Sequence, residues 1–370
     1  MKFVGVDLHT NKFTCCYRDN NSSMDEKSGK VTETFTLSAS GLASFYTTLT
    51  PDTYVLLEAT ITSFAFVRLI QPFVKEVIVA NTYELKQINL AAKKTDKIDA
   101  DKLCRIIKMQ VLSGERAVTP VTIPPEGIQE LRGLFSTYRL LKKKTGQTKN
   151  RIHSVVKERL YGYTQEEIFS KKRRKELLEL ETGTTMAFHL GLLFTELEQL
   201  EEHIEILEGK IMELAAPYMK EIEILTSMKG VSVFIAIAVI ADIICVDRFK
   251  NSKAFTSYLR SAPRVSSSNT SVKNKGTNKR GRKLAATLLT QSLNHVLDAS
   301  PKLAKWYDRL TEGKKAGLVR TGLRRRVLAE MYQMLKKGEY HYGREALKHE
   351  LKLRQYRKFL EKRKILSEIA

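Results

Sequence analysis

The chain has 370 residues, enough for two or three domains, with 42% hydrophobic residues and a formal net charge of +22. No apolar run approaches the roughly 18 residues that a membrane span needs, and the opening residues 1–9 are too short and too acidic for a secretory segment. The four cysteines lack metal-binding spacing, which is typical of a reduced protein. A cytoplasmic protein with no membrane part is expected.

The positive charge is unevenly distributed along the chain. Residues 248–370 hold 31 Lys and Arg against 9 Asp and Glu, so the last third carries the whole excess. Such asymmetry indicates a polyanionic partner, most simply nucleic acid. A basic tail that only aids solubility is the alternative.

Residues 1–110 alternate between strand and helix patterns. Three strands, "KFVGVDLH", "KFTCCYR" and "VTETFTL", come first and look antiparallel. They are followed by helix "SGLASFYTTL", strand "TYVLLEA", helix "SFAFVRLIQPF", strand "EVIVAN" and helical sequence to about Met109. This order predicts an α/β domain with a ribonuclease-H-like (RuvC-like) fold. A doubly wound dinucleotide-binding domain is the competing interpretation, but no G-x-G-x-x-G follows the first strand.

The rest of the chain is expected to be all-α. Residues 111–222 read as a linker, "AVTPVTIPPEG", and a helical coiled-coil region. Between Met186 and Leu214 apolar residues alternate in steps of four and three, which is a heptad seam. The seam can pair with the preceding helix of the same chain or with another subunit. We expect a combination of the two, and a homo-oligomer.

Residues 223–300 are expected to form a mostly helical C-terminal domain. Its "LTSMKGVSVFIAIAVIADI" is a helix-hairpin-helix-like segment, which can offer backbone amides to a phosphate backbone or can be an ordinary buried helical hairpin. The following "SAPRVSSSNTSVKNKGTNKRGRKLAA" is expected to be polar and flexible before it becomes a basic helix. Residues 301–370 read as a basic helical tail.

Four carboxylates stand in positions that should be buried. Asp7 is the only acidic residue in its apolar strand, and a lone carboxylate there is costly unless it is paired or binds a cation. Glu58 ends the apolar run "YVLLE". Asp96 and Asp99 share one face at the start of a helix, whereas Asp101 falls off that face. The replacement of Asp101 by asparagine is therefore expected to leave activity largely intact.

In a ribonuclease-H-like arrangement the first and fourth strands are neighbours at the sheet centre. Asp7 and Glu58 would then converge, and the helix with Asp96 and Asp99 could pack across them. Oxygen-only ligands favour Mg²⁺ or Mn²⁺, which assist phosphoryl transfer. The alternative is that the aspartates only complement the dipole of a helix whose N-cap is Thr95.

Several segments resemble one family in their order and spacing. "GVDLHTNKF", "LLEAT", "KTDKIDADKL", "KNRIHSVV", "SMKGVSVFIAIAVIADI", "RFKNSKAFTSYL" and "NKRGRKL" are similar to those of the DEDD insertion-sequence transposases, the family that includes the bridge-RNA-guided recombinases. The resemblance covers about residues 1–295. It implies a transposase or recombinase that cuts and rejoins DNA strands, with catalytic and metal-binding Asp7, Glu58, Asp96 and Asp99.

The same resemblance implies partners and a nucleophile. The partners are DNA (element ends and target), a structured guide RNA, and further copies of the chain in a tetramer built from dimers. Ser268 has the family's spacing after Pro263, and Ser266 and Ser267 are the neighbouring candidates. Asn269 stands where the family usually has glycine, and Arg260 also replaces a usual glycine.

Two sets of basic residues are expected to contact nucleic acid. They lie in "KNRIHSVV" and "NKRGRKL" and comprise Lys149, Arg151, Lys279, Arg280, Arg282 and Lys283. Two rival functions remain open. One is a RuvC-like junction resolvase that uses metal and water alone, and the other is a non-catalytic nucleic-acid-binding protein.

Overall fold

A computed structural model describes residues 1–22, 29–83, 85, 95–268, 271–277 and 280–363. The chain divides into two compact units, Met1–Pro124 and Pro125–Ala370. Among the described residues, no helix is long and apolar enough to cross a membrane.

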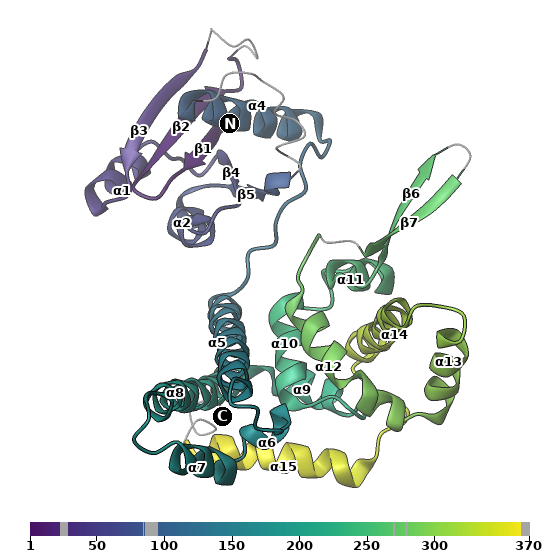
Figure 1. The fold of residues 1–370 in the computed structure, drawn as a ribbon. Helices are drawn as coiled ribbons and strands as arrows, with labels where there is room; N and C mark the ends of the chain where they lie inside the picture. The colour runs from purple at the N-terminus through teal and green to yellow at the C-terminus, as the bar shows by residue number, and fades with distance from the viewer. Residues whose placement is uncertain (23–28, 84, 86–94, 269–270, 278–279, 364–370) are drawn as a thin grey trace. The chain divides into compact units, whose positions relative to one another are not determined.

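The first unit is built on a five-stranded sheet with the order β3-β2-β1-β4-β5 (Figure 1). The pairs β1–β2 and β2–β3 are antiparallel, whereas β1, β4 and β5 run parallel. The predicted central pairing of the first and fourth strands is therefore confirmed, although the ribonuclease-H-like classification stays a prediction. The strands are β1 (Lys2–Leu8), β2 (Lys12–Asp19), β3 (Val31–Thr36), β4 (Thr53–Glu58) and β5 (Glu76–Ala80).

The apolar runs of β1 and β4 arise because both faces of the sheet are covered. Val6 and Leu57 belong to one core cluster, and Phe3 and Leu56 belong to the cluster on the opposite face. Residues of α1 and α2 join the first cluster and residues of α4 join the second. Within the described residues of this unit, the helices whose bounds are defined are α1 (Ala39–Tyr46), α2 (Ser63–Ile70), the 3-10 helix η1 (Gln71–Phe73) and α4 (Asp96–Ser113).

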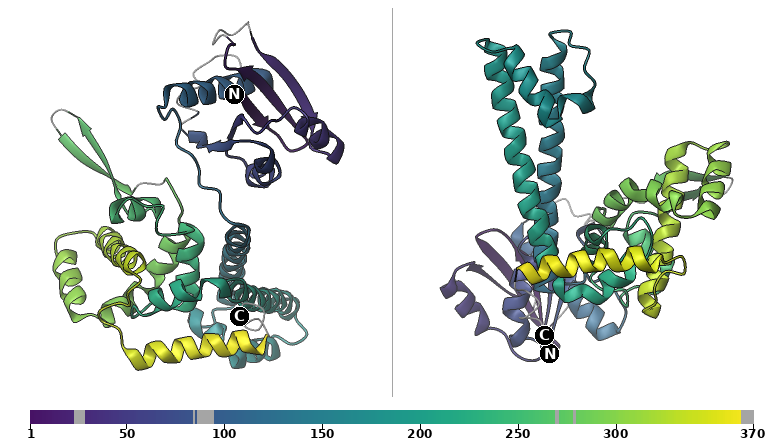
Figure 2. Two further views of the ribbon diagram at one scale, coloured as in Figure 1. Left: turned by 180° about the vertical axis from the view of Figure 1, so that it is seen from behind. Right: turned by 90° about the horizontal axis from the view of Figure 1, so that it is seen from below.

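The second unit contains two long helices, α5 (Glu126–Lys157) and α8 (Thr185–Leu214), which lie side by side (Figure 2, right). The heptad seam of α8 faces α5: Leu190 and Leu197 share a core cluster with Ile152, and Ile204 shares another with Leu131. The intrachain part of the predicted seam is confirmed. A contact of the seam with another subunit is not needed to bury these residues.

This packing changes the expected effect of a charge in the seam. Leu200 is buried within the chain, so Leu200→Lys should lower the melting temperature without changing the molar mass in light scattering. An unpaired charge in such a position costs several kcal/mol. Gln199, which is exposed on the same helix and directly precedes Leu200, provides the matched control, because Gln199→Lys should leave the melting temperature nearly unchanged. A Leu200→Lys protein of smaller mass and wild-type stability would contradict the intrachain assignment.

Residues 301–363 are mostly helical, as predicted, but they pack into the core of the second unit. Val327 and Met331 of α14 and Leu360 of α15 lie in the same large core cluster as Ile237 of α10. The helical character of this segment agrees with the prediction, whereas its apolar residues complete the core of the second unit and do not extend from it as a tail. The remaining helices are α6 (Gln165–Ile168), α7 (Lys171–Leu180), η2 (Ala216–Tyr218), α9 (Met219–Thr226), α10 (Val233–Ile243), α11 (Ser252–Tyr258), α12 (Leu284–Asp298), α13 (Pro301–Thr311), α14 (Ala316–Lys337) and α15 (Ala346–Lys362).

The serine-rich segment is not an unstructured connection. It forms an antiparallel hairpin of β6 (Pro263–Ser268) and β7 (Ser271–Thr277). The basic residues after it do not start a helix either, because α12 begins only at Leu284, with Lys283 as its N-cap. The strand pairing was not predicted, and the predicted helix begins after the basic residues and not within them.

Candidate active site

Two of the predicted acids end neighbouring parallel strands. The register pairs Val6 of β1 with Leu57 of β4, so the next residues along each strand are Asp7 and Glu58. Because side chains alternate along a strand, both acids project to the face opposite Val6 and Leu57. That face carries α4. The backbone therefore directs Asp7 and Glu58 to the same side of the sheet.

The start of α4 supplies the other two acids. The Thr95 side chain accepts a hydrogen bond from the Ile98 amide and caps the helix, and Asp96 and Asp99 lie in its first turn. The prediction that Thr95 caps this helix is therefore confirmed. The cap does not exclude a metal site, because the same turn of α4 lies against β1.

A glycine permits the close approach of α4 to β1. A β-carbon on Gly5 would come within 2.1 Å of the Ala100 carbonyl oxygen and 2.2 Å of the Cys104 amide nitrogen. No other residue type fits there without displacing the helix. Gly5 is two residues before Asp7, so the contact that it allows also sets the distance between Asp7 and the first turn of α4.

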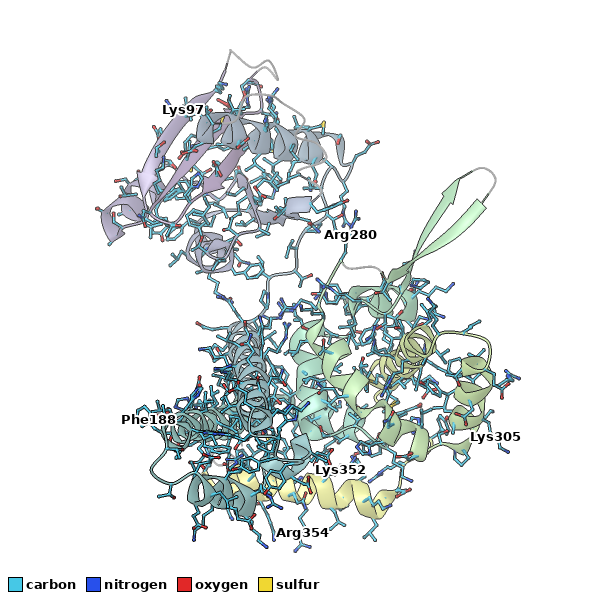
Figure 3. The ribbon with its side chains drawn as sticks, in the orientation of Figure 1. Lys97, Phe188, Arg280, Lys305, Lys352 and Arg354 are labelled. Carbon is cyan, nitrogen blue, oxygen red and sulfur yellow. The ribbon has the colours of Figure 1, made fainter. Side chains whose placement is uncertain are left out.

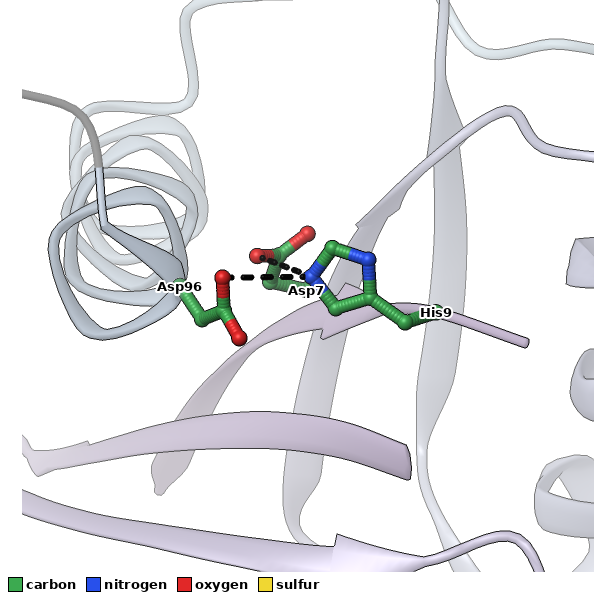
Figure 4. Close-up of side chains that lie close together, drawn as sticks. All are labelled: Asp7, His9 and Asp96. Carbon is green, nitrogen blue, oxygen red and sulfur yellow. Dashed lines mark hydrogen bonds and ion pairs between the residues drawn. The ribbon is translucent and has the colours of Figure 1, made fainter. Parts of the chain in front are cut away.

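Asp7, His9 and Asp96 form a compact group (Figure 4). His9 Nε2 lies 3.2 Å from Asp7 Oδ2 and 3.3 Å from Asp96 Oδ1. One ligand atom from each of the three residues lies within 4.8 Å of the others. On the other side of Asp96, Lys12 Nζ lies 2.8 Å from Oδ2. Cationic or ligating groups thus gather around the two carboxylates.

The electrostatics of this group favour a bound cation. Burial raises the pKa of Asp7, His9 acts in the opposite direction, and the carboxylates of Asp96 and Asp99 raise it further. The hydrogen bond from Lys12 lowers the pKa of Asp96. Three acids this close repel one another, and a divalent ion relieves that repulsion. The donor set fits Mg²⁺ or Mn²⁺ on its oxygens, and the added imidazole nitrogen suits Mn²⁺ better than Mg²⁺.

Two of the four predicted acids are not in the compact group. Asp99 is near enough to raise the pKa of Asp7, but its Oδ1 lies 3.4 Å from Lys102 Nζ. Glu58 is half-buried on the correct face, at the position beside Asp7 that the register gives. Its inclusion in the site rests on that register.

Asp101 has a different role from the other aspartates of α4. It is buried and its Oδ1 accepts a hydrogen bond of 2.9 Å from Arg18, which is itself completely buried, while Oδ2 lies 3.2 Å from Lys30 Nζ. Asp101 therefore joins α4 to β2 and lies outside the Asp7–His9–Asp96 group. The prediction that Asp101→Asn leaves activity largely intact considered only the metal site and did not include the effect of this buried ion pair on stability.

His9 is the residue that sequence reasoning missed. It follows β1 directly and stands two residues after Asp7, so the alternation of an extended chain already places it on the same side. The sequence "DLH" at the end of an apolar strand is therefore the pattern from which His9 could have been predicted to lie beside Asp7.

The predicted nucleophile lies in the second unit. Ser268 is the last residue of β6 and pairs with Ser271 across the hairpin. Arg260, three residues before the hairpin, has a φ of 52°, and its Nε donates a 2.7 Å hydrogen bond to the Gly281 carbonyl. A left-handed backbone explains why glycine suits position 260.

The expected nucleic-acid-binding residues differ in their surroundings. Arg151 is exposed on α5, whereas Lys149 lies 3.0 Å from Glu201. Arg280 (Figure 3) and Lys283 are exposed, but Arg282 lies 3.0 Å from Asp242, a carboxylate with no exposed surface. Lys279 lies outside the described residues.

The Arg282–Asp242 pair is structural. Asp242 Oδ2 also accepts a 2.9 Å hydrogen bond from the Ala285 amide in the first turn of α12. Arg282 therefore helps to fix the start of α12, and its capacity to bind a phosphate is reduced.

Comparisons with known proteins agree with this organisation. Residues 4–160 match the family model of the IS110-type DEDD transposases, described as Transposase, and residues 222–308 match the model described as Transposase IS116/IS110/IS902 family. Together the two matches cover more than half of the chain. No curated protein matches it.

Proposed function

We propose that this chain, which belongs to the IS116/IS110/IS902 family of transposases, cuts and rejoins DNA strands with a carboxylate metal site and a serine nucleophile. The observation that carries the proposal is the convergence of Asp7, His9 and Asp96 at the edge of the sheet where the parallel strands end. Transposition of DNA is the function that the family supports, and the chemistry described next is our proposal.

Asp7, Glu58, Asp96 and Asp99 would hold one or two divalent ions, Mg²⁺ or Mn²⁺. The ion, when bound, supplies positive charge that neutralises a phosphate during its displacement. The protein holds the four acids on a rigid sheet and helix, and Gly5 keeps that helix close. Lys12, whose Nζ is 2.8 Å from Asp96, orients this acid.

Ser268 is proposed as the attacking group. Its hydroxyl oxygen forms a bond to a DNA phosphorus atom while the bond from phosphorus to the departing sugar oxygen breaks, and that oxygen receives the proton. The resulting phosphoserine diester keeps the energy of the broken bond for rejoining. A serine hydroxyl is a poor nucleophile at its free pKa and needs a base or a metal nearby. The acids of the first unit would supply it, from the same chain or from another subunit.

Ser268→Ala should abolish the covalent protein–DNA adduct that wild-type protein forms with labelled DNA, guide RNA and Mg²⁺, because no other group replaces the attacking oxygen. Denaturing electrophoresis detects the adduct. Ser267→Ala is the matched control and should keep it.

An adduct that survives in Ser268→Ala but is lost in Ser267→Ala would move the assignment one residue back. Cleavage without an adduct in every variant would favour a resolvase that uses water. Binding without cleavage would favour a non-catalytic protein.

The nucleic-acid contacts and the assembly complete the proposal. Arg151, Arg280 and Lys283 are the exposed members of the two basic sets and the best candidates for phosphate contacts. A structured guide RNA and a tetramer built from dimers follow from the family resemblance. Since the heptad seam is filled within the chain, the exposed Phe188, Leu192 and Ile206 of α8 are the better candidates for contact with another subunit.

A further inference from the structure

The loop between α14 and α15, residues 338–345, presents three consecutive aromatic side chains. They are Tyr340, His341 and Tyr342, and the Tyr342 residue is 85% exposed. Together with residues of α11 and α14 they line a cavity of about 450 Å³. One exposed aromatic side chain needs no explanation, but two exposed tyrosines and a half-buried histidine around a cavity of ligand size do. This loop also lies beyond both regions that match the transposase families.

The loop is held in one conformation. The His341 amide donates a 2.8 Å hydrogen bond to Ser227 Oγ, and its ring Nε2 lies 3.4 Å from Glu330. The guanidinium of Arg344 covers the Tyr340 ring at 4.4 Å. Because these contacts already order the aromatic residues, a ligand that binds them pays little for ordering the loop.

The geometry of the Tyr342 ring suits a planar ligand. The His341 and Tyr342 rings have centroids 4.3 Å apart and are inclined by 36°. His341 lies against one side of the Tyr342 ring. Because Tyr342 is 85% exposed, the rest of its ring is accessible to a ligand. Stacking on such a ring is sequence-tolerant, because every nucleobase has a flat π-face.

The cavity includes a cationic side chain that can bind an anion. Its two carboxylates are engaged, Glu330 with the loop histidine and Glu339 with Lys337 at 3.8 Å. Arg326 is exposed and stacks on the Trp306 ring at 5.3 Å. Within the described part of the chain Arg326 has no ion pair, so its guanidinium can bind a phosphate while its plane rests on the indole.

We propose that this cavity binds an unpaired nucleotide of single-stranded DNA. The base stacks on Tyr342, next to Tyr340 in the cavity wall, and Arg326 binds the adjacent phosphate. A duplex is disfavoured, because its bases stack on one another and are not free to stack on protein rings. The choice of DNA rests on the proposed function, whereas the recognition of a base and a phosphate rests on this loop alone.

The position of contact is tested by photocrosslinking. Full-length protein is irradiated with a short oligo(dT) in which one base is 5-iodouracil, and the modified peptides are mapped by mass spectrometry. We expect the main adduct at Tyr340 or Tyr342. Adducts confined to other segments would overturn the proposal.

The contribution of the Tyr342 ring to binding affinity is tested by fluorescence anisotropy with labelled oligo(dT) in buffer without divalent metal. Tyr342→Leu should weaken binding about fivefold or more, which is the lower range for losing one stacked base. Tyr342→Phe should bind like wild type, because the ring is kept. Phe73→Leu, at an exposed aromatic residue of the first unit, is the matched control and should also bind normally.

Equal binding by Tyr342→Leu and Tyr342→Phe would contradict stacking. Preference for oligo(U) over oligo(dT) by tenfold or more would overturn the assignment to DNA. Both assays omit metal and strand cleavage and can use the Ser268→Ala protein. Their failure is therefore distinguishable from failure of the proposed transposase chemistry.

Discussion

Gly5→Ala should disrupt the first unit and with it the metal site. The added β-carbon would lie 2.1 Å from the Ala100 carbonyl oxygen and 2.2 Å from the Cys104 amide nitrogen, both of them backbone atoms that no rotamer change can move. The helix must shift away from β1, at a cost of more than about 3 kcal/mol. The first turn of α4, with Asp96, would move away from Asp7.

Hydrogen exchange followed by mass spectrometry measures this effect in each unit separately. Peptides from β1 and α4 should exchange faster in Gly5→Ala, whereas peptides from α5 and α8 should not change. Gly133→Ala is the control, since a β-carbon there has no neighbour within 4 Å and the position is helical. It should be neutral or stabilising by up to about 1 kcal/mol. Wild-type exchange in β1 and α4 of Gly5→Ala would show that the packing differs.

Asp101→Asn should destabilise the first unit even though Asp101 is not a metal ligand. The substitution leaves the guanidinium of Arg18, which has no exposed surface, without its carboxylate. Removing one partner of a buried pair costs about 3–5 kcal/mol. The double variant Arg18→Met/Asp101→Asn should be less destabilised than Asp101→Asn, because no buried charge is left unpaired.

Asp101 also makes the stability of the first unit depend on pH, and its basic partners determine the direction of that dependence. Burial alone would raise the pKa of Asp101, but the hydrogen bonds from Arg18 and Lys30 lower it below the ordinary 3.8. A lowered pKa means that the stabilisation is fully present above 3.8 and is lost as the pH falls from there through the folded-state value. Acid unfolding of the first unit should thus depend less on pH in Asp101→Asn. Asp52→Asn, at an exposed site, should unfold like wild type.

The sheet and the position of the acids were predictable from sequence because they depend on alternation and strand order. Apolar runs broken only by Asp7 and Glu58 specify two parallel strands buried on both faces, and register follows from that burial. The helical spacing of Asp96 and Asp99 likewise places them in one turn. His9 was not predicted as a site residue because it lies just beyond a strand, where a histidine is expected to belong to a loop.

The second unit was harder to predict for identifiable reasons. In β6 and β7 serine and other polar residues predominate, so no apolar face marks the hairpin, which is held by backbone hydrogen bonds. In residues 301–370 the high density of Lys and Arg hides an apolar stripe at Leu323, Val327 and Met331, which have helical spacing and are buried. A heptad pattern alone does not reveal whether its partner helix belongs to the same chain.

Binding of Mn²⁺ tests the carboxylate site most directly, and it requires neither DNA nor turnover. The free Mn²⁺ signal in electron paramagnetic resonance falls as the ion binds to protein. Wild-type protein should bind Mn²⁺, and Glu58→Gln and Asp96→Asn should each bind it at least about tenfold more weakly, since each loses a charged ligand. Asp52→Asn should bind like wild type. Full Mn²⁺ affinity in both Glu58→Gln and Asp96→Asn would contradict a metal site at the meeting of β1, β4 and α4.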